Sequence, residues 1–248
     1  LAQMGVQFVK DCIVGKTISV EDLKEDGFKG IFVASGAGLP NFMNIPVEYS
    51  INIISSNEYL TRVNLMDAAS EDSDTPVAFG KNVAVIGGGN TAMEDALYLA
   101  GFCRKVYVLN RSKKFRAAAT MVENVKRNGK ITVLTDAVVD KFVGSNMLEG
   151  VDIRNTVTGE KSILNVSGAI VAIGVKPSSD LAKDCGVECC QHGFVKTDMY
   201  LATNITGIFA AGDVRVSPLR QVITAAADGA IAATSAVNYV NELGIKSI

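Results

Sequence analysis

The chain has 248 residues, of which 48% are hydrophobic and 20% charged, and its formal net charge is −2. These values describe an ordinary globular chain, long enough for one large or two small domains. The lack of net positive charge argues against a nucleic-acid partner. The apolar runs, such as 169–175, are too short to cross a bilayer, and no basic, apolar leader opens the sequence. We therefore expect a cytoplasmic protein without membrane contact.

The cysteines suggest neither a disulfide framework nor a metal site. They are Cys12, Cys103, Cys185, Cys189 and Cys190, an odd number with no C-x-x-C spacing. The group at 185–190 lacks the histidine partners or repeated pairs of a zinc site. We expect reduced thiols, no bound metal and no catalytic role for the neighbouring His192, and the role of the cysteine group stays open.

The N-terminal third is expected to alternate short strands and helices. Apolar runs predict strands at 6–9, around 13–20 and at 31–34, with a short helical turn opening at Glu21. The strand at 31–34 enters a turn of small residues that includes Gly36, where backbone amides could lie against a ligand or against a crossing segment of the chain. An amphipathic helix is predicted at 57–69, with Leu60, Val63, Leu65 and Met66 on its apolar side.

A glycine-rich turn at residues 87–92 is the most informative motif. The β-branched run 83–86 predicts a buried parallel strand, and a helical pattern follows the turn at once. In this G-x-G-x-x-A motif, Gly87 permits a tight turn, Gly89 lets a pyrophosphate approach the backbone, and Ala92 brings the helix close to the strand. A helix N-terminus also favours phosphate. Such a turn can be purely structural, but a strand before it and a helix after it favour a dinucleotide site.

The second strand of this unit, predicted at 106–109, is followed by a basic loop. The stretch from Val106 to Ala119 contains four cations and no acidic residue. An acidic residue here would bind the ribose 2′-hydroxyl of NAD, whereas arginines accept the 2′-phosphate of NADP. Basic loops are often merely solvated. The position after the second strand favours NADPH as the coenzyme.

Four successive antiparallel strands are predicted next, at 131–134, 137–142, 151–155 and 162–166. A hairpin turn is expected at 155–160, between the last two of them. An apolar strand is predicted after them, at 169–173. The segment 207–213 reads as a strand that runs into a Gly-Asp turn, and a helix is predicted at 221–243. Asp213 could accept hydrogen bonds from ligand hydroxyls, or it could be a turn or helix-capping residue. The sequence pattern leaves these alternatives open.

Taken together, these segments resemble the flavoprotein reductases with two dinucleotide-binding domains, which include thioredoxin reductases, the glutamate synthase small subunit and NADPH:ferredoxin oxidoreductase subunits. Segments 36–46 and 57–66 resemble the glutamate synthase small-subunit group in particular. Segment 83–92 is similar to the NADPH motif of the superfamily, and segments 207–213 and 219–233 to its C-terminal flavin motif.

The resemblance implies roles for individual residues. The NADPH pyrophosphate would be held by Gly87, Gly89, Asn90 and Thr91, in a cofactor site that also includes Ala92. Its 2′-phosphate would be held by Arg111 and Arg116. The nicotinamide side would be bordered by Gly174 and by Glu94, which we place in the first turn of the nucleotide helix. FAD would be contacted by Gly36, Gly212 and Asp213, with Gln221, Val222 and Thr224 near its isoalloxazine ring. No catalytic side chain is expected.

Two departures from the resemblance matter. Thioredoxin reductases carry a C-x-x-C just before the NADPH motif, but the stretch 75–81 has no cysteine, so thiol–disulfide exchange lacks its chemical group. The superfamily also begins with a separate FAD fingerprint, and the glutamate synthase group with cysteines for iron–sulfur clusters. This chain shows a single fingerprint. We interpret it as a fragment that starts inside the FAD domain.

The expected fold is therefore α/β and Rossmann-like: an incomplete FAD-binding domain from residues 1–77 and 203–248, with an NADPH-binding domain inserted at 78–202. The expected activity of the intact protein is hydride transfer from NADPH to FAD, and then to iron–sulfur clusters, a large partner subunit or a ferredoxin-type acceptor. The alternative is a module that binds NADP(H) without flavin and catalyses nothing alone.

Overall fold

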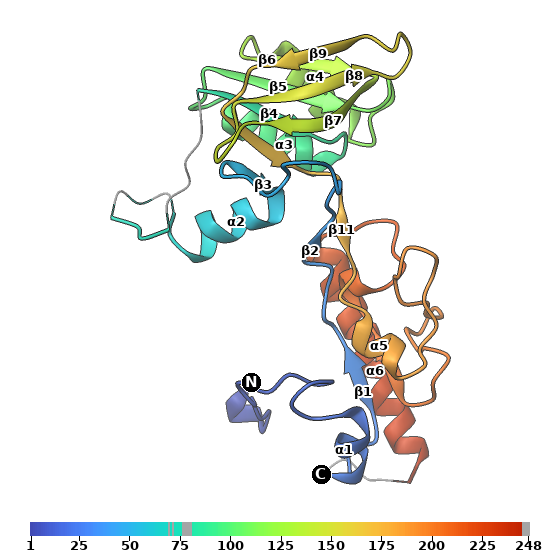
Figure 1. Cartoon of the computed structure of the whole chain (residues 1–248). Helices are drawn as coiled ribbons and strands as arrows, with labels where there is room; N and C mark the ends of the chain where they lie inside the picture. Colours follow the sequence, from blue (N-terminus) through green and yellow to red (C-terminus); the bar gives the residue numbers. More distant parts are fainter. Residues whose placement is uncertain (69, 71, 76–80, 245–248) are drawn as a thin grey trace. The chain divides into compact units, whose positions relative to one another are not determined.

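The computed structural model describes residues 1–68, 70, 72–75 and 81–244, and the chain divides into two compact units (Figure 1). Unit 1 consists of Leu1–Leu39 and Lys176–Ile248, and unit 2 is Pro40–Val175. The boundaries fall within two short strands, β2 (Leu39–Pro40) and β11 (Val175–Lys176). Among the described helices, none combines the length and the apolar character that a bilayer span needs.

Unit 2 is built on a five-stranded parallel sheet. In spatial order its strands are β3 (Ile53–Ser55), β10 (Gly168–Val171), β4 (Asn82–Ile86), β5 (Lys105–Asn110) and β6 (Ile131–Thr135). The central strand β4 is buried from Val83 to Ile86, because both of its faces are covered, which is why its sequence is continuously apolar. The strand predicted at 83–86 is confirmed. The antiparallel direction predicted for 131–134 is wrong, since β6 runs parallel to β5 with Val106 opposite Ile131.

The two faces of β4 belong to two different cores. Val83 and Val85 pack with the helices α3 (Asn90–Leu99) and α4 (Ala119–Arg127). Ala84 and Ile86 pack with residues of a three-stranded antiparallel sheet made of β7 (Ala137–Val143), β8 (Gly150–Asn155) and β9 (Lys161–Leu164). Figure 1 shows α3 and the β7–β8–β9 sheet beside the strands of the parallel sheet. This alternation follows from the two-residue period of a strand.

The hairpin turn predicted at 155–160 is confirmed between β8 and β9. Asn155 Oδ1 accepts hydrogen bonds from the backbone N–H groups of Val157 and Thr158, at 2.9 and 3.0 Å. The Gly159 N–H donates to the Asn155 carbonyl, and the φ of Gly159 is 73°, a conformation that favours glycine.

Helix α2 (Ser56–Leu65) is shorter than the predicted 57–69, and its predicted apolar side is largely wrong. Leu65 is 82% exposed and Leu60 is 43% exposed. Tyr59 and Val63 are the residues of α2 that contact the core shared with α3. The helix has both polar and apolar residues around its circumference, so periodicity alone could not identify the buried side.

Unit 1 contains a two-stranded parallel sheet, β1 (Ile31–Val33) with β12 (Ile208–Ala210), and the long helix α6 (Val222–Glu242). Its shorter elements are the helices α1 (Val20–Glu25) and α5 (Asp180–Asp184) and the 3₁₀ turns η1 (Ala2–Met4) and η2 (Gly212–Val214). The predicted strands 31–34, 207–213 and helix 221–243 are confirmed within one to two residues at most ends. The strands predicted at 6–9 and 13–20 are wrong: the described residues there form one isolated bridge, Val14 with Ile18.

The compact units divide at 39/40 and 175/176, whereas the sequence places domain boundaries at 77/78 and 202/203. Residues 77 and 78 lie outside the described part of the chain, and the predicted domain division stays a prediction. Strand β3 and helix α2 join unit 2 because β3 pairs with β10 and Tyr59 of α2 enters the core beneath β4. The two strands of the β3–β10 pair are separated by more than a hundred residues, so neighbouring residues in the sequence do not indicate this pairing.

Candidate functional site

The glycine turn after β4 has the geometry that its sequence predicts. Gly87 has a φ of 150°, and a Cβ on it would lie 2.3 Å from the Ala172 carbonyl oxygen and 3.1 Å from the Ala92 Cβ. Ala92 is fully buried. A side chain at position 87 and a larger one at position 92 would therefore force α3 away from the sheet.

Gly89 has a different role. It is the N-cap of α3, with φ −93° and ψ 177°, and it makes no side-chain cap hydrogen bond. Beyond its chain neighbours, none of the described heavy atoms lies within 4 Å of a Cβ built on Gly89. The space over this residue is open, and glycine has no side chain that could cap the amides of the first helical turn. A phosphate group fits such a place, where the helix dipole is favourable.

The basic loop after β5 is tied to this turn. The Arg116 and Ala117 N–H groups donate to the Gly88 carbonyl, at 2.8 and 3.1 Å. Asn90 Oδ1 accepts a hydrogen bond from the Ala118 N–H at 2.9 Å. Asn90 therefore uses its side chain to hold α3 against the start of α4.

Turn and loop together line a cavity of about 670 Å³ in unit 2. Its wall includes Gly87 and Gly88 from the turn and Arg111, Lys114 and Arg116 from the loop. None of the described residues that line it is acidic. The apolar part of the wall consists of Phe42, Met43, Ile45, Ile86, Leu109, Ala137, Val138, Val139 and Ile173. An anion between glycine amides and three cations is the ligand that this arrangement favours.

Three further residues predicted for this site do not line the cavity: Thr91, Glu94 and Gly174. Thr91 is exposed at the start of α3. Glu94 is exposed and lies in the second turn of α3, because the helix begins at Asn90; its predicted place in the first turn is wrong. Gly174, with a φ of 112°, accepts a hydrogen bond from the Asn41 N–H at 3.0 Å, and Asn41 lines the cavity.

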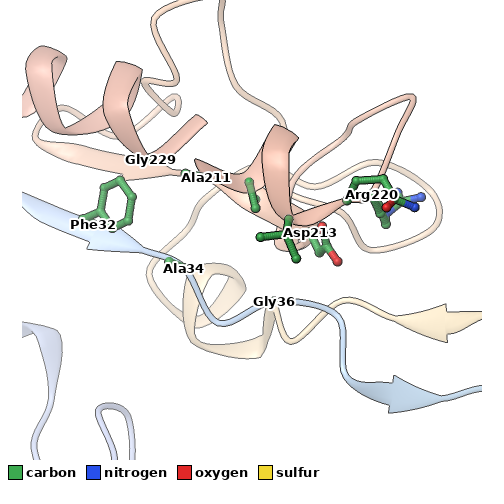
Figure 2. Close-up of a pocket in the computed structure, with 11 residues that line it drawn as sticks. Phe32, Ala34, Gly36, Ala211, Asp213, Arg220 and Gly229 are labelled. Carbon is green, nitrogen blue, oxygen red and sulfur yellow. The ribbon is translucent and has the colours of Figure 1, made fainter. Parts of the chain in front are cut away.

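A second cavity, of about 510 Å³, lies in unit 1 (Figure 2). Its walls come from β1 and the turn after it, from the turn η2 and from the start of α6. The lining residues are Phe32, Ala34, Gly36, Ala211, Gly212, Asp213, Arg220, Gln221, Val222, Ala225 and Gly229. Five predicted flavin-site residues thus come together here. The sixth, Thr224, instead caps α6: its hydroxyl accepts from the Gln221 N–H and donates to the Gln221 carbonyl.

The sequence did not indicate two residues that line or support the cavity walls, Arg220 and Glu48. In unit 1, the Arg220 guanidinium stacks on the Phe194 ring, 4.0 Å from its centroid, and its buried Nε has no hydrogen-bond partner among the described residues. Its position directly before Gln221 was the available signal. In unit 2, the buried Glu48 carboxylate accepts hydrogen bonds from the N–H groups of Met43, Asn44 and Ile45 and so shapes the cavity wall.

Cys185 and Cys189 lack the features of reactive thiols. All five are free, and burial raises the pKa of Cys185 and of Cys189 above the ordinary value. Such a thiol is a poor nucleophile and a poor metal ligand at neutral pH. Within the described ranges, no group of three or more metal-ligating side chains is found.

Comparison with known proteins supports the fold. The family model for pyridine nucleotide-disulphide oxidoreductases matches residues 2–229. The thioredoxin reductase of Peptoclostridium acidaminophilum is 36% identical over an alignment 250 positions long, which covers 96% of this chain and 75% of the relative. The thioredoxin reductase of Helicobacter pylori is 41% identical over 167 residues, which cover 64% of this chain and 53% of the relative. This chain thus spans about half of the latter protein.

Among solved structures, thioredoxin reductase from Lactococcus lactis in its FR conformation superposes with a TM-score of 0.75 at 31% identity, covering 86% of this chain and 67% of the other. These relatives are thioredoxin reductases, so they do not support the narrower likeness to glutamate synthase small subunits. The chain has the α/β, Rossmann-like fold with two dinucleotide-binding domains of the thioredoxin reductases, and it belongs to the pyridine nucleotide-disulphide oxidoreductase family.

Proposed function

We propose that this chain belongs to an NADPH-dependent flavoprotein oxidoreductase and that unit 2 holds the NADPH. The observation that carries the proposal is the unit 2 cavity, where a glycine turn at a helix N-terminus faces a loop with three lining cations. An acidic residue after the second strand would indicate NAD instead, and position 110 is asparagine.

In this proposal, the backbone of Gly87 and Gly89 and the first amides of α3 bind the pyrophosphate. Arg111 and Arg116, with Lys114 between them, bind the 2′-phosphate through charge-assisted hydrogen bonds. Gly89 is the residue that a pyrophosphate must approach most closely, which agrees with the open space over it.

The unit 1 cavity fits part of a flavin. Asp213 can accept hydrogen bonds from ribityl hydroxyls, and Arg220 adds a positive charge to the cavity wall. When both groups are bound, the nicotinamide supplies a hydride and the flavin accepts it. The chain binds and orients these groups, and no side-chain acid or base is required for this step.

Two observations bear on the electron acceptor: the sequence has no C-x-x-C pair, and segments 36–46 and 57–66 resemble the glutamate synthase small-subunit group. The relatives are named thioredoxin reductases, yet the 248 residues contain no C-x-x-C. Thiol–disulfide exchange needs such a pair. We therefore propose iron–sulfur clusters, a large partner subunit of the glutamate synthase kind or a ferredoxin-type protein as acceptor, in the cytoplasm.

A second candidate function is NADP(H) binding without flavin. The observation in its favour is the single dinucleotide fingerprint of the sequence, since the pyrophosphate of FAD then has no glycine turn of its own. In this case the chain binds the coenzyme through unit 2 and transfers no electrons alone.

Absorption spectra of the purified chain with added FAD, before and after anaerobic NADPH or NADH, separate these functions. Retained flavin that NADPH bleaches and NADH does not would support the oxidoreductase. Binding of NADP⁺ without retained flavin would support the second candidate.

The two arginines of the basic loop can be tested directly. Replacing Arg111 and Arg116 together by alanine should weaken NADP⁺ binding by roughly a hundredfold, because two charge-assisted contacts are lost, and leave NAD⁺ binding unchanged. Equal binding of NADP⁺ and NAD⁺ to the unaltered chain would contradict the assignment of NADPH.

A further inference from the structure

Asn110 occupies the last position of β5, where the strand meets the basic loop. It is only 6% exposed, although it is polar and lines the unit 2 cavity. A buried amide needs hydrogen-bond partners, so its contacts show what the side chain does.

The carboxamide nitrogen of Asn110 closes the loop on itself. Asn110 Nδ2 donates to the Ser112 carbonyl at 2.6 Å and to the Lys114 carbonyl at 3.2 Å. The Ser112 hydroxyl donates to the same Lys114 carbonyl at 2.9 Å. These bonds fold the loop into a compact turn around one side chain.

The carboxamide oxygen of Asn110 faces the glycine turn. A Cβ on Gly88 would lie 2.3 Å from Asn110 Oδ1, so only glycine at position 88 leaves room for this side chain. The Gly88 carbonyl in turn accepts the N–H groups of Arg116 and Ala117. The loop is therefore fixed to the glycine turn at its start by packing and at its end by hydrogen bonds.

We propose that Asn110 is the positioning residue for coenzyme selection, because it gives the loop the shape in which Arg111, Lys114 and Arg116 line the cavity beside the glycine turn. The inference rests on the proposed binding of NADPH in unit 2. Asn110 acts through the loop and need not touch the coenzyme. An aspartate of the same size could not donate to the two carbonyl groups, and its charge would oppose a 2′-phosphate.

The test is calorimetric binding of NADP⁺ and of NAD⁺ to the full chain, which requires no flavin. Asn110→Leu keeps the approximate size of the side chain and removes both donors. It should weaken NADP⁺ binding by roughly ten- to a hundredfold, because misplaced groups lose most of their contact energy, and change NAD⁺ binding by less than about threefold. The preference for NADP⁺ should fall by the same factor.

Asn155→Leu is the matched control, since Asn155 also organises a loop of unit 2 through two hydrogen bonds but does not line the cavity. It should leave the preference unchanged. Asn110→Ser keeps one donor and should give an intermediate preference, and it decides the question if Asn110→Leu does not fold.

Three results distinguish the possibilities. Loss of NADP⁺ and NAD⁺ affinity by the same factor would assign Asn110 a purely structural role and overturn the inference. Unchanged affinity for both coenzymes in both Asn110 variants would also overturn it. If the unaltered chain binds NAD⁺ as tightly as NADP⁺, the proposed coenzyme itself is wrong, and the inference fails with it.

Discussion

Arg215 and Asp228 form a bidentate ion pair that connects the turn η2 with helix α6. Arg215 Nε and Nη2 each lie 2.6 Å from a carboxylate oxygen of Asp228, and the Gly212 N–H donates to the same carboxylate at 3.0 Å. The side chains are 19% and 9% exposed. The pair therefore holds in place the turn that carries Asp213, a residue of the unit 1 cavity.

Replacement of Asp228 by alanine should destabilise the chain by about 3 kcal/mol, because it leaves the Arg215 charge without its partner in a largely buried place. Urea unfolding measures the change. The double variant Arg215→Met/Asp228→Leu should recover most of the loss, since it removes both charges and keeps the volume. A double variant as unstable as the single one would show that the pair acts through more than its charges.

The same pair predicts an acid dependence. The hydrogen bond from Arg215 is the main reason why the pKa of Asp228 lies below its ordinary value. A lowered pKa in the folded state adds stability above the pKa of the unfolded chain, and this stability is lost as the pH falls through the folded pKa. The stability difference between the unaltered chain and Asp228→Asn should therefore be largest at neutral pH and shrink below about pH 4.

Gly87 and Gly89 should respond differently to alanine. Gly87→Ala should unfold or strongly destabilise unit 2, since its Cβ would collide with the Ala172 carbonyl and its φ of 150° is unfavourable for alanine. Gly89→Ala should fold normally, because its backbone angles suit any residue and its Cβ meets open space. It should nevertheless lose NADP⁺ affinity, as the methyl group occupies the approach of the pyrophosphate.

Thermal unfolding and NADP⁺ calorimetry on the two glycine variants check this pair of predictions. A Gly89→Ala variant that binds NADP⁺ as tightly as the unaltered chain would place the pyrophosphate elsewhere.

Asp95 of α3 predicts a dependence of the opposite sign. It is 5% exposed, its Oδ2 has no hydrogen-bond partner in the described part of the chain, and burial raises its pKa from 3.8 to about 6, with the charge of Glu94 adding to the rise. The folded state therefore favours the neutral acid. The stability that neutral Asp95 contributes is fully present below the pKa of this carboxyl in the unfolded chain. This contribution is lost as the pH rises through the folded pKa of about 6.

Asp95→Asn should accordingly stabilise the chain at neutral pH, by at most about 3 kcal/mol, and have no effect near about pH 4. Urea unfolding at the two pH values measures this. Glu123→Gln, which removes an exposed partner of Arg127 on α4, is the control and should change stability by less than about 1 kcal/mol at either pH. A stabilisation that is equal at both pH values would contradict the explanation by charge.

Glu48 is expected to stabilise the wall of the unit 2 cavity. Its buried carboxylate binds three consecutive backbone N–H groups of the cavity wall, so Glu48→Ala should cost about 1–3 kcal/mol of stability and weaken NADP⁺ binding. Glu48→Gln keeps one acceptor oxygen and should lose less of both. Hydrogen exchange of the Met43 and Asn44 amides reports the local loosening directly.

The sequence alone determined the strand–turn–helix unit around Gly87, because a buried apolar strand, two glycines of distinct function and a small residue at position 92 all act within ten residues of each other. It also identified the basic loop and the Gly-Asp turn, which are local patterns of charge and backbone freedom. Tertiary structure decided the parallel direction of β6, the buried side of α2 and the boundaries of the compact units.

It also decided that Asp228 pairs with Arg215 and that Asn110 lies against Gly88. These features depend on which distant segments meet, and a residue's own neighbours in sequence carry no record of such contacts. A buried hydrogen bond or ion pair adds stability only when folding removes water from a polar group and a specific partner takes the place of that water. The sequence could therefore indicate where a ligand binds, and the folded chain alone shows which side chains hold that place in shape.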